Sequence, residues 1–440
     1  MQQVLTYIHE HRQTLFEQWY ALAQRLADTA HLSQPALLIE LFKEQHILLR
    51  PLEGFPSVLY GEQLTHTSST IPSFTLLLWS QHDASFTKTH QWNALAMRLL
   101  ALQLYQDIYE SLPLRILWMI ETGNEQHGSS IYSSLSIMEH NQHFLQVDGC
   151  ICDLPTPSSI PAMTLGTKGS LRVSVEADTA QTRTSALYGS ILPDAAWQLV
   201  WCLSSLKDKR EELLIEHFYD TLIPPDDDEI ALLTNASLVG FPFEQDGHTP
   251  LFGLQGLQAR YAAQFLPSCT ITFVNSGTPS DDNTYQAQES RQATIPIYSH
   301  ALLDFYLVPD QQPQDIFSKL QEHITAHGFQ DVRLRLLRST PTLHTPFRYS
   351  FIQSIHEAAL QVQASEHVYA EALTMIPFAT ENTFSSSLLP PATMPIIFHQ
   401  FGLLDNNKRF DTQIQSTHFA HLAHFCVFLE GFRHATTTTC

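Results

Sequence analysis

A strand-helix-strand unit is the sequence feature that most constrains the fold. Two nearly continuous apolar runs, Phe74–Trp79 and Leu114–Ile120, are typical of strands that are buried on both faces of a sheet. Between them, Trp92–Tyr109 contains neither glycine nor proline, and this composition predicts a helix. Strand, helix and strand in this order predict a parallel sheet and therefore an α/β protein.

The pattern changes after Pro161, where Gly169–Val175 alternates between apolar and polar residues like a half-exposed strand. Helices and strands then follow one another in the order typical of a small α+β sandwich. The predicted elements are a helix at Ala195–Leu206 with Trp197 and Trp201, a strand at His300–Val308, a helix at Gln314–His327 and a strand at Val332–Leu337. A second domain of this class is therefore expected.

Length and charge limit the possible functions. A chain of 440 residues exceeds what one hydrophobic core of about 250–300 residues accommodates, so at least two domains are expected. Lys and Arg number 23 against 44 Asp and Glu, a net charge of −21 that disfavours nucleic acids and anionic membranes as partners. Apolar runs fall far short of the ~20 residues of a membrane span, and the polar start is unlike a secretory signal. A soluble, cytoplasmic protein is expected.

Common catalytic motifs are missing from the sequence. It contains no P-loop, no GxGxxG after a strand, no GxSxG elbow and no HExxH. His418, His421 and His424 recur at steps of three, which drift around a helix and do not converge on one ion. We therefore interpret these histidines as one partly buried helix face in preference to a metal site.

Several segments, taken together, resemble the dinuclear-zinc metallopeptidases of the carnosinase, aminoacylase and glutamate-carboxypeptidase type (peptidase family M20). The similar segments occur in the family's order along nearly the whole chain. They are Gly54–Glu62 (GFPSVLYGE), Met163–Pro193 (MTLGTKGSLRVSVEADTAQTRTSALYGSILP), His217–Pro225 (HFYDTLIPP) and Thr294–Leu320 (TIPIYSHALLDFYLVPDQQPQDIFSKL).

This resemblance implies a split catalytic domain of the α/β class with a mixed, mainly parallel sheet, and an α+β lid inserted into it. The catalytic domain would comprise residues 1–164 and 339–440, and the lid residues 165–338. In this family the lid commonly mediates a homodimer, so a homodimer is expected. The change of pattern after Pro161 gives similar boundaries independently.

The resemblance also assigns positions to the metal site, and most of them are substituted. The first His ligand falls on Gln81, although Asp83, at the ligand-orienting position, is kept. The carboxylate that would bridge two zinc ions is missing, with His90 or Gln91 in its place. The general-base position holds Glu125, and the ligand position beside it holds Gln126. An amide oxygen is a much weaker zinc ligand than imidazole or carboxylate.

Two further ligand positions fall on Asp153, which retains a ligand-type side chain, and on Arg409, which cannot deprotonate and bind zinc. Arg409 could instead act as a fixed cation that pairs with Asp153 or Glu125. The family's substrate-binding His and Arg fall on Thr184 and Tyr306.

We therefore predict a catalytically inactive member of this family that acts by binding or scaffolding, with no cofactor. The alternative is a metal-dependent hydrolase of peptide or acyl-amino-acid bonds with a rebuilt site. There, Asp153 and either His82 or His90 would hold zinc, and Glu125 would be the base.

Overall fold

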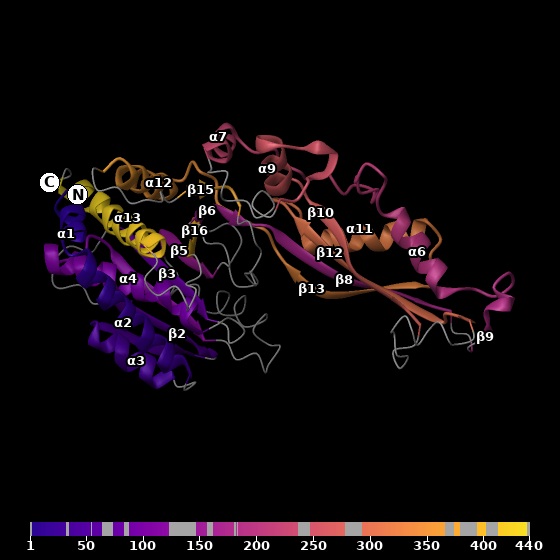
Figure 1. The fold of residues 1–440 in the computed structure, drawn as a ribbon, viewed down its shortest axis with the longest axis horizontal. Coiled ribbons are helices and arrows are strands. Elements are labelled where there is room, and N and C mark those ends of the chain that lie inside the picture. The colour runs from indigo at the N-terminus through magenta and orange to yellow at the C-terminus, as the bar shows by residue number, and fades with distance from the viewer. Residues whose placement is uncertain are drawn as a thin grey trace. The chain divides into compact units, whose positions relative to one another are not determined.

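Figure 1 shows the computed structural model of the chain. It describes residues 2–31, 35–53, 55–63, 74–82, 88–122, 147–155, 162–179, 182, 184–235, 247–277, 293–365, 374–378, 394–401 and 412–437. The chain forms two compact units. Unit 1 comprises Met1–Thr167, Pro225–Gln264 and His344–Cys440, and unit 2 comprises Lys168–Pro224 and Phe265–Leu343. Residues 225–264 thus group with unit 1, whereas the boundaries predicted from the sequence place them in the inserted domain.

Unit 1 is built on a mixed sheet with the strand order β1-β2-β4-β3-β5-β16-β6-β15. Its strands are β1 (Ile47–Leu52), β2 (Phe55–Gln63), β3 (Thr75–His82), β4 (Arg115–Thr122), β5 (Gly149–Pro155), β6 (Ala162–Thr164), β15 (Thr374–Ile376) and β16 (Ile396–Phe401). The central strands β4, β3, β5 and β16 run parallel, and antiparallel pairs flank them. The prediction of a mixed, mainly parallel sheet is confirmed.

Helices accompany this sheet, and several of them bury its apolar strands. They are α1 (Gln2–Glu10), α2 (Arg12–His31), α3 (Pro35–Glu44), α4 (Lys88–Tyr109), α7 (Asp227–Asn235), α9 (Gly256–Phe265), α12 (Ser350–Gln363) and α13 (Thr412–Thr437). Near the N-terminus, Val4, Ile8, Leu15, Trp19, Leu22 and Leu26 recur at steps of three, four and seven, an apolar stripe that predicts one long helix. The chain forms two helices instead, because the helical segment is interrupted at His11. The apolar stripe still works as predicted, since Val4, Ile8, Leu15 and Trp19 are all buried in one core.

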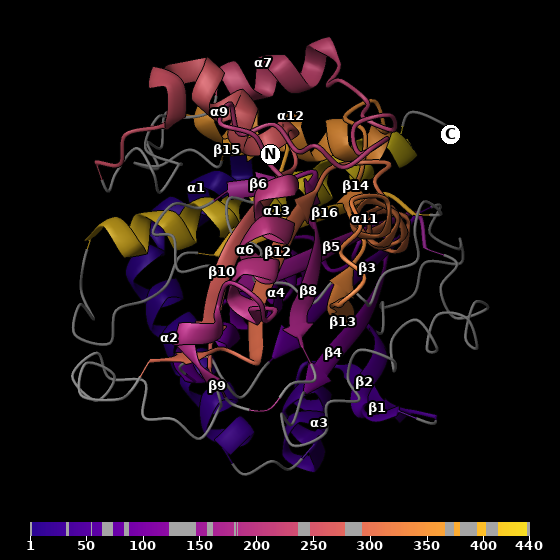
Figure 2. The same ribbon diagram turned by 90° about the vertical axis from the view of Figure 1, so that its right-hand side faces the viewer.

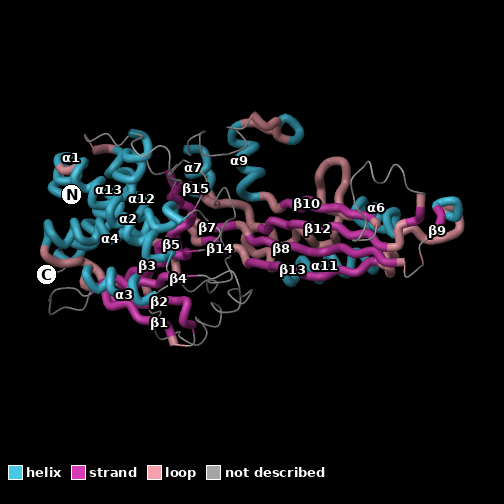
Figure 3. The backbone as a smooth tube through the Cα atoms, turned by 60° about the horizontal axis from the view of Figure 1, so that its bottom comes forward, coloured by secondary structure: helices cyan, strands magenta, loops and turns pink. Residues whose placement is uncertain are grey.

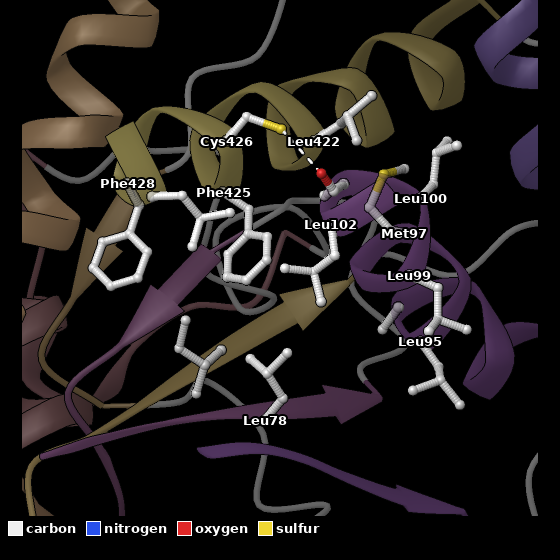
Figure 4. Packing of buried hydrophobic residues seen from close by; sticks show 14 of the residues in the cluster. Leu78, Leu95, Met97, Leu99, Leu100, Leu102, Leu422, Phe425, Cys426 and Phe428 are labelled. Carbon is white, nitrogen blue, oxygen red and sulfur yellow. Dashed lines mark hydrogen bonds between the residues drawn. The ribbon is translucent and has the colours of Figure 1, made fainter. Parts of the chain in front are cut away.

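The helix between β3 and β4 is deeply buried. Every residue of α4 from Trp92 to Leu102 is buried, which explains why its sequence shows no polar face. Figure 4 shows how α4 packs between β3 and α13, with Leu78 of the strand below it and Leu422 of the last helix above. The thiol of Cys426 lies 3.7 Å from the carbonyl oxygen of Ala101 and ties the two helices together.

Unit 2 is a four-stranded antiparallel sheet with two helices on one face. Its strands are β8 (Gly169–Asp178), β10 (Ser268–Ser276), β12 (Tyr298–Leu307) and β13 (Val332–Thr340), in the order β10-β12-β8-β13 (Figure 2). Its helices α6 (Ala195–Ser205) and α11 (Pro313–Ala326) cover the alternate residues Leu171, Val173, Val175 and Ala177 of β8. The sequence predicted β8, β12, β13 and both helices, but it missed β10.

None of the helices in the described part of the chain is both long enough and apolar enough to cross a membrane.

Leu78 tests the core of unit 1. Leu78 lies in β3 and is 1% exposed beneath the helices that cover the sheet, whereas Leu48 in β1 is 56% exposed. Leu78→Ala should lower the free energy of unfolding by about 2–5 kcal/mol, because it removes buried apolar contacts and leaves a cavity. Leu48→Ala, the matched control, should change it by less than about 0.5 kcal/mol. Urea denaturation followed by tryptophan fluorescence measures both. Equal losses in the two variants would contradict this packing.

Candidate functional site

Three side chains form a row across the parallel centre of the sheet in unit 1. Ser80 of β3 and His399 of β16 are both directly opposite Asp153 of β5 in the strand register. Residues that are opposite one another in neighbouring strands project from the same face of a sheet. The next residues inward, Trp79, Cys152 and Phe398, also pair in register, and they must project from the opposite face.

Arg98 of α4, a helix that packs on the sheet, contacts this row of side chains. Its Nη2 lies 3.1 Å from Oδ1 of Asp153, and the two side chains are only 1% and 6% exposed. The hydroxyl of Ser80 donates to Oδ2 of the same carboxylate at 3.1 Å. The guanidinium also lies over the ring of Phe425 in α13, 4.6 Å from its centroid. The carboxylate therefore has a polar partner on each oxygen, and the cation also has an aromatic neighbour.

His399 accepts a second hydrogen bond from the same nitrogen of Arg98. The distance from Nη2 to Nδ1 of His399 is 2.7 Å. A guanidinium has no lone pair to offer, so Nδ1 must be the acceptor, and a neutral His399 carries its proton on Nε2. Burial holds the pKa of His399 well below its ordinary value, and the nearby positive charge of Arg98 lowers it further. His399 is therefore neutral in the folded protein.

Two histidines of α13 complete the cluster. The ring of His424 lies 5.5 Å from that of His399, and the ring of His421 lies 5.9 Å from it. Nε2 of His424 is 2.9 Å from the carbonyl oxygen of Ile355, and because a carbonyl only accepts, this nitrogen carries the proton. Burial lowers the pKa of His424 to about 4. His421 and His424 lie on one face of α13, as interpreted from the sequence, but they are fully and not partly buried. The side chain of His418 lies outside the described residues.

Charge in this cluster is balanced by a single ion pair. Burial raises the pKa of Asp153 and lowers that of Arg98, and each charge opposes the shift of the other. A guanidinium does not lose its proton in proteins, so the pair remains ionic. Both groups are buried.

The described residues around Asp153 do not fit a zinc ligand set. A zinc ion on this carboxylate would lie beside a permanent positive charge that already neutralises it. His399 directs its lone pair at Arg98, so that nitrogen is not available to a metal. Among the described residues, no three His, Cys, Asp or Glu side chains gather in a group that could hold a metal ion.

Comparison with known proteins identifies relatives of this fold. No protein-family model matches the chain. The beta-Ala-His dipeptidase of Rattus norvegicus is 28% identical over 141 residues, which are 31% of this chain and 28% of that protein. The human beta-Ala-His dipeptidase is 31% identical over 133 residues, 30% of this chain and 26% of that protein. The chain thus matches little more than a quarter of the length of these curated relatives.

Solved structures resemble the chain over most of its length. An M20 family metallo-carboxypeptidase, Sso-CP2 from Sulfolobus solfataricus, has a TM-score of 0.65 at 19% identity, over 88% of this chain and 94% of that one. This chain has the fold of the M20 metallopeptidases. The di-peptidase Dug1p from Saccharomyces cerevisiae (TM-score 0.62, 16% identity, 97% and 98% covered) and human carnosine dipeptidase 1 (0.59, 17%, 98% and 98%) agree. The resemblance predicted from the motifs is confirmed at the level of the fold.

Most of the positions assigned from the M20 motifs lie outside the described residues. Gln81 and His82 end β3 and His90 lies in α4, but the side chains of these three residues are not described. The positions of Asp83, Glu125, Gln126 and Arg409 are outside the described ranges altogether. Their roles, including that of Arg409 as a fixed cation, therefore stay predictions. Asp153 is the assigned metal position that the structure describes in full.

The two assigned substrate positions lie in unit 2. Thr184 begins β9 (Thr184–Ser185), and its hydroxyl donates to the carbonyl oxygen of Thr182 at 2.9 Å. Tyr306 projects from β12 and is 39% exposed. A threonine hydroxyl and a phenol offer no positive charge, so neither can supply the ion pair of an arginine with a substrate carboxylate.

Sequence reasoning missed Arg98 and His399. A signal for Arg98 was available, because it is the one Lys, Arg, Asp or Glu between Lys88 and Asp107 in a helix of otherwise apolar character. A charge in such a position needs a buried partner of opposite sign. The identity of that partner depends on long-range packing, since Asp153 is 55 residues away in sequence.

Replacing Arg98 tests the buried pair. Arg98→Met should cost about 3–5 kcal/mol of unfolding free energy, because it leaves the carboxylate of Asp153 buried without a counter-charge. The double variant Arg98→Met/Asp153→Asn should recover more than about 1 kcal/mol of that loss, as coupled sites do. Arg25→Met, which breaks the exposed pair of Arg25 with Glu44, should cost less than about 1 kcal/mol. Urea denaturation measures all three, and additive losses in the double variant would contradict the pairing.

Proposed function

We propose that this chain is a catalytically inactive relative of the M20 metallopeptidases that acts by binding or scaffolding. The observation that carries the proposal is the ion pair of Asp153 with Arg98. Asp153 is the one assigned ligand position that keeps a carboxylate, and its charge is already neutralised by the chain itself. A guanidinium at 3.1 Å opposes the approach of a second cation to the same carboxylate.

Substitutions at the other assigned positions support the same proposal. Gln81 and Gln126 offer neutral amides where an imidazole and a carboxylate are expected, and Arg409 offers a cation where an imidazole is expected. A catalytic zinc needs three good protein ligands and a water. With these side chains, no metal would be held to polarise the water that attacks the substrate.

A working hydrolase is the second candidate, and the names of the curated relatives favour it. Both are beta-Ala-His dipeptidases, and Asp83 and Glu125 retain the residue types of a ligand-orienting group and a general base. In this alternative, Asp153 would have to leave Arg98 and bind zinc together with His82 or His90. A peptide or acyl-amino acid would then be the substrate.

Metal content and hydrolysis decide between the two candidates. Protein purified without a His tag and dialysed against zinc should contain well under one zinc per chain. It should also release no histidine from β-alanyl-histidine. The measurements are elemental analysis and an amino-acid assay. Stoichiometric zinc together with hydrolysis that Glu125→Gln abolishes would establish the alternative. The Glu125→Gln control excludes a contaminating peptidase.

We also propose that unit 2 forms a homodimer. Trp197 and Trp201 on α6 stack at 5.7 Å and are 56% and 54% exposed. Ile271 and Val274 of the edge strand β10 are 49% and 55% exposed. Large exposed apolar side chains in such number are typical of a surface that another protein covers. A second copy of the chain is the partner that the M20 resemblance favours.

Replacing the two tryptophans with charged residues tests this dimer. The full chain should have twice the mass of a single chain in light scattering coupled to size exclusion. Trp197→Glu/Trp201→Glu should give the mass of one chain, because it places two carboxylates in an apolar interface. Leu360→Glu, at a 49% exposed position of α12 in unit 1, is the matched control and should remain dimeric. A monomeric native chain would refute the dimer.

A further inference from the structure

Strand β13 carries three exposed arginines along the edge of the sheet in unit 2. Arg333, Arg335 and Arg338 lie within six consecutive residues of a chain that has only 23 Lys and Arg in 440. In the described part of the sheet β13 is an end strand, with β8 on one side, and Figure 3 shows it at the lower edge of the four strands. An edge strand presents unpaired backbone N–H and C=O groups on its outer side.

The three arginines share the open face of this sheet. In the strand register their partners on β8 are Glu176, Ser174 and Arg172. These residues alternate with Val173 and Val175, which α6 and α11 cover. The arginines therefore project from the face opposite to the two helices.

Positive charge is in excess on this face. Arg172 makes a bidentate pair with Asp304, at 2.6 and 2.9 Å, and Arg335 pairs with Glu176. Both carboxylates thus already have an arginine partner. Arg333 and Arg338 make no ion pair with any described residue. Asp178 of β8 lies on the same face as these pairs, and Arg338 acts electrostatically on Asp304. On the described strands, four arginines against three carboxylates leave this face with a net positive charge, even though the chain as a whole carries −21.

The spacing of the arginines selects an extended partner. Residues two apart on a strand are separated by roughly 6.6 Å, and Arg333 and Arg338 by about 16 Å. One small anion cannot bridge that distance, whereas carboxylates at alternate positions of an extended peptide repeat at the same interval. A long polyanion such as a nucleic acid is disfavoured, because the net negative charge of the chain repels its many phosphates much more than the few carboxylates of a short segment.

We propose that β13 is a docking edge for an extended acidic segment of another protein. The segment adds as a strand along Val332–Leu336, where the register is regular, and places its carboxylates against Arg333 and Arg335. The register shifts between Leu336 and Arg338, so backbone pairing ends there and Arg338 binds a carboxylate beyond it. Leu337, 47% exposed at this bulge, supplies an apolar contact. This inference is independent of whether the chain hydrolyses peptides.

Binding of labelled peptides to the full chain tests the proposal. The probe is a short fluorescent peptide of alternating Glu and Thr, followed by anisotropy. A peptide of alternating Glu and Pro carries the same charge, but it lacks every second N–H and has the φ angle of each Pro fixed at about −65°, so it pairs poorly as a strand. The Glu–Thr peptide should bind at least about tenfold more tightly than the Glu–Pro peptide, and added salt should weaken its binding.

Variants assign the binding to β13. The double variant Arg333→Glu/Arg338→Glu should bind the Glu–Thr peptide about tenfold or more weakly than the native chain. Arg333→Gln/Arg338→Gln should lose less affinity. Lys43→Glu/Arg50→Glu, at exposed positions in and beside the edge strand β1 of unit 1, is the matched control and should bind like the native chain. Thermal melting checks that each variant is folded.

Three outcomes would overturn the proposal. Equal affinity for the Glu–Thr and Glu–Pro peptides would show a purely electrostatic surface. Tighter binding of single-stranded DNA or of inorganic phosphate than of the peptide would assign the arginines to another class of anion. No binding of any probe would mean that the arginines only keep the edge from pairing with other chains, a recognised role of charge on edge strands.

Discussion

The ion pair of Arg98 with Asp153 is the interaction on which the rest of unit 1 depends. A charge enclosed in a protein core costs several kcal/mol unless a partner of opposite sign compensates it. Arg98 lies on α4 and Asp153 on β5. The pair therefore forms only when α4 packs on β5 in one orientation and at one position along the strand. His399 of β16 and Phe425 of α13 contact the same guanidinium. One side chain thus fixes the relation of two strands and two helices.

This pair also links the fold to the proposed function. In a metallopeptidase a metal ion supplies the positive charge that holds carboxylates together at the end of a parallel sheet. Here the chain supplies a positive charge of its own at Asp153, the assigned position that has kept its carboxylate. In the proposed inactive relative, the fold would need no metal at this residue, and the chain would act through its surfaces. The exposed tryptophans of α6 and the arginines of β13 are two such surfaces.

Much of the fold was predictable from local sequence pattern. The apolar runs of β3 and β4 and the helix between them determine a parallel pair, and the alternation in β8 identifies a strand with one covered face. Strand β10 was missed although Cys269, Ile271 and Phe273 alternate with Thr270 and Thr272, a strand signal that the sequence does contain. The interruption at His11 left no mark in the apolar stripe, which continues through it.

The candidate site was predictable only in part. Family motifs led to Asp153, but its partner is a helix residue with no motif around it. Local patterns indicate that Arg98 is buried and cannot indicate what it meets, because this depends on how α4, β5 and β16 pack. The histidines of α13 illustrate the same limit, since their spacing excluded a neat metal site but did not reveal that they pack around His399.

A crystal structure measured at the zinc absorption edge, from crystals grown with zinc, tests the central claim most directly. The ion pair predicts no anomalous density on the carboxylate of Asp153, with the guanidinium of Arg98 still within hydrogen-bonding distance of it. An anomalous peak bound to Asp153, with Arg98 displaced, would contradict the claim that the chain replaces the metal with its own cation.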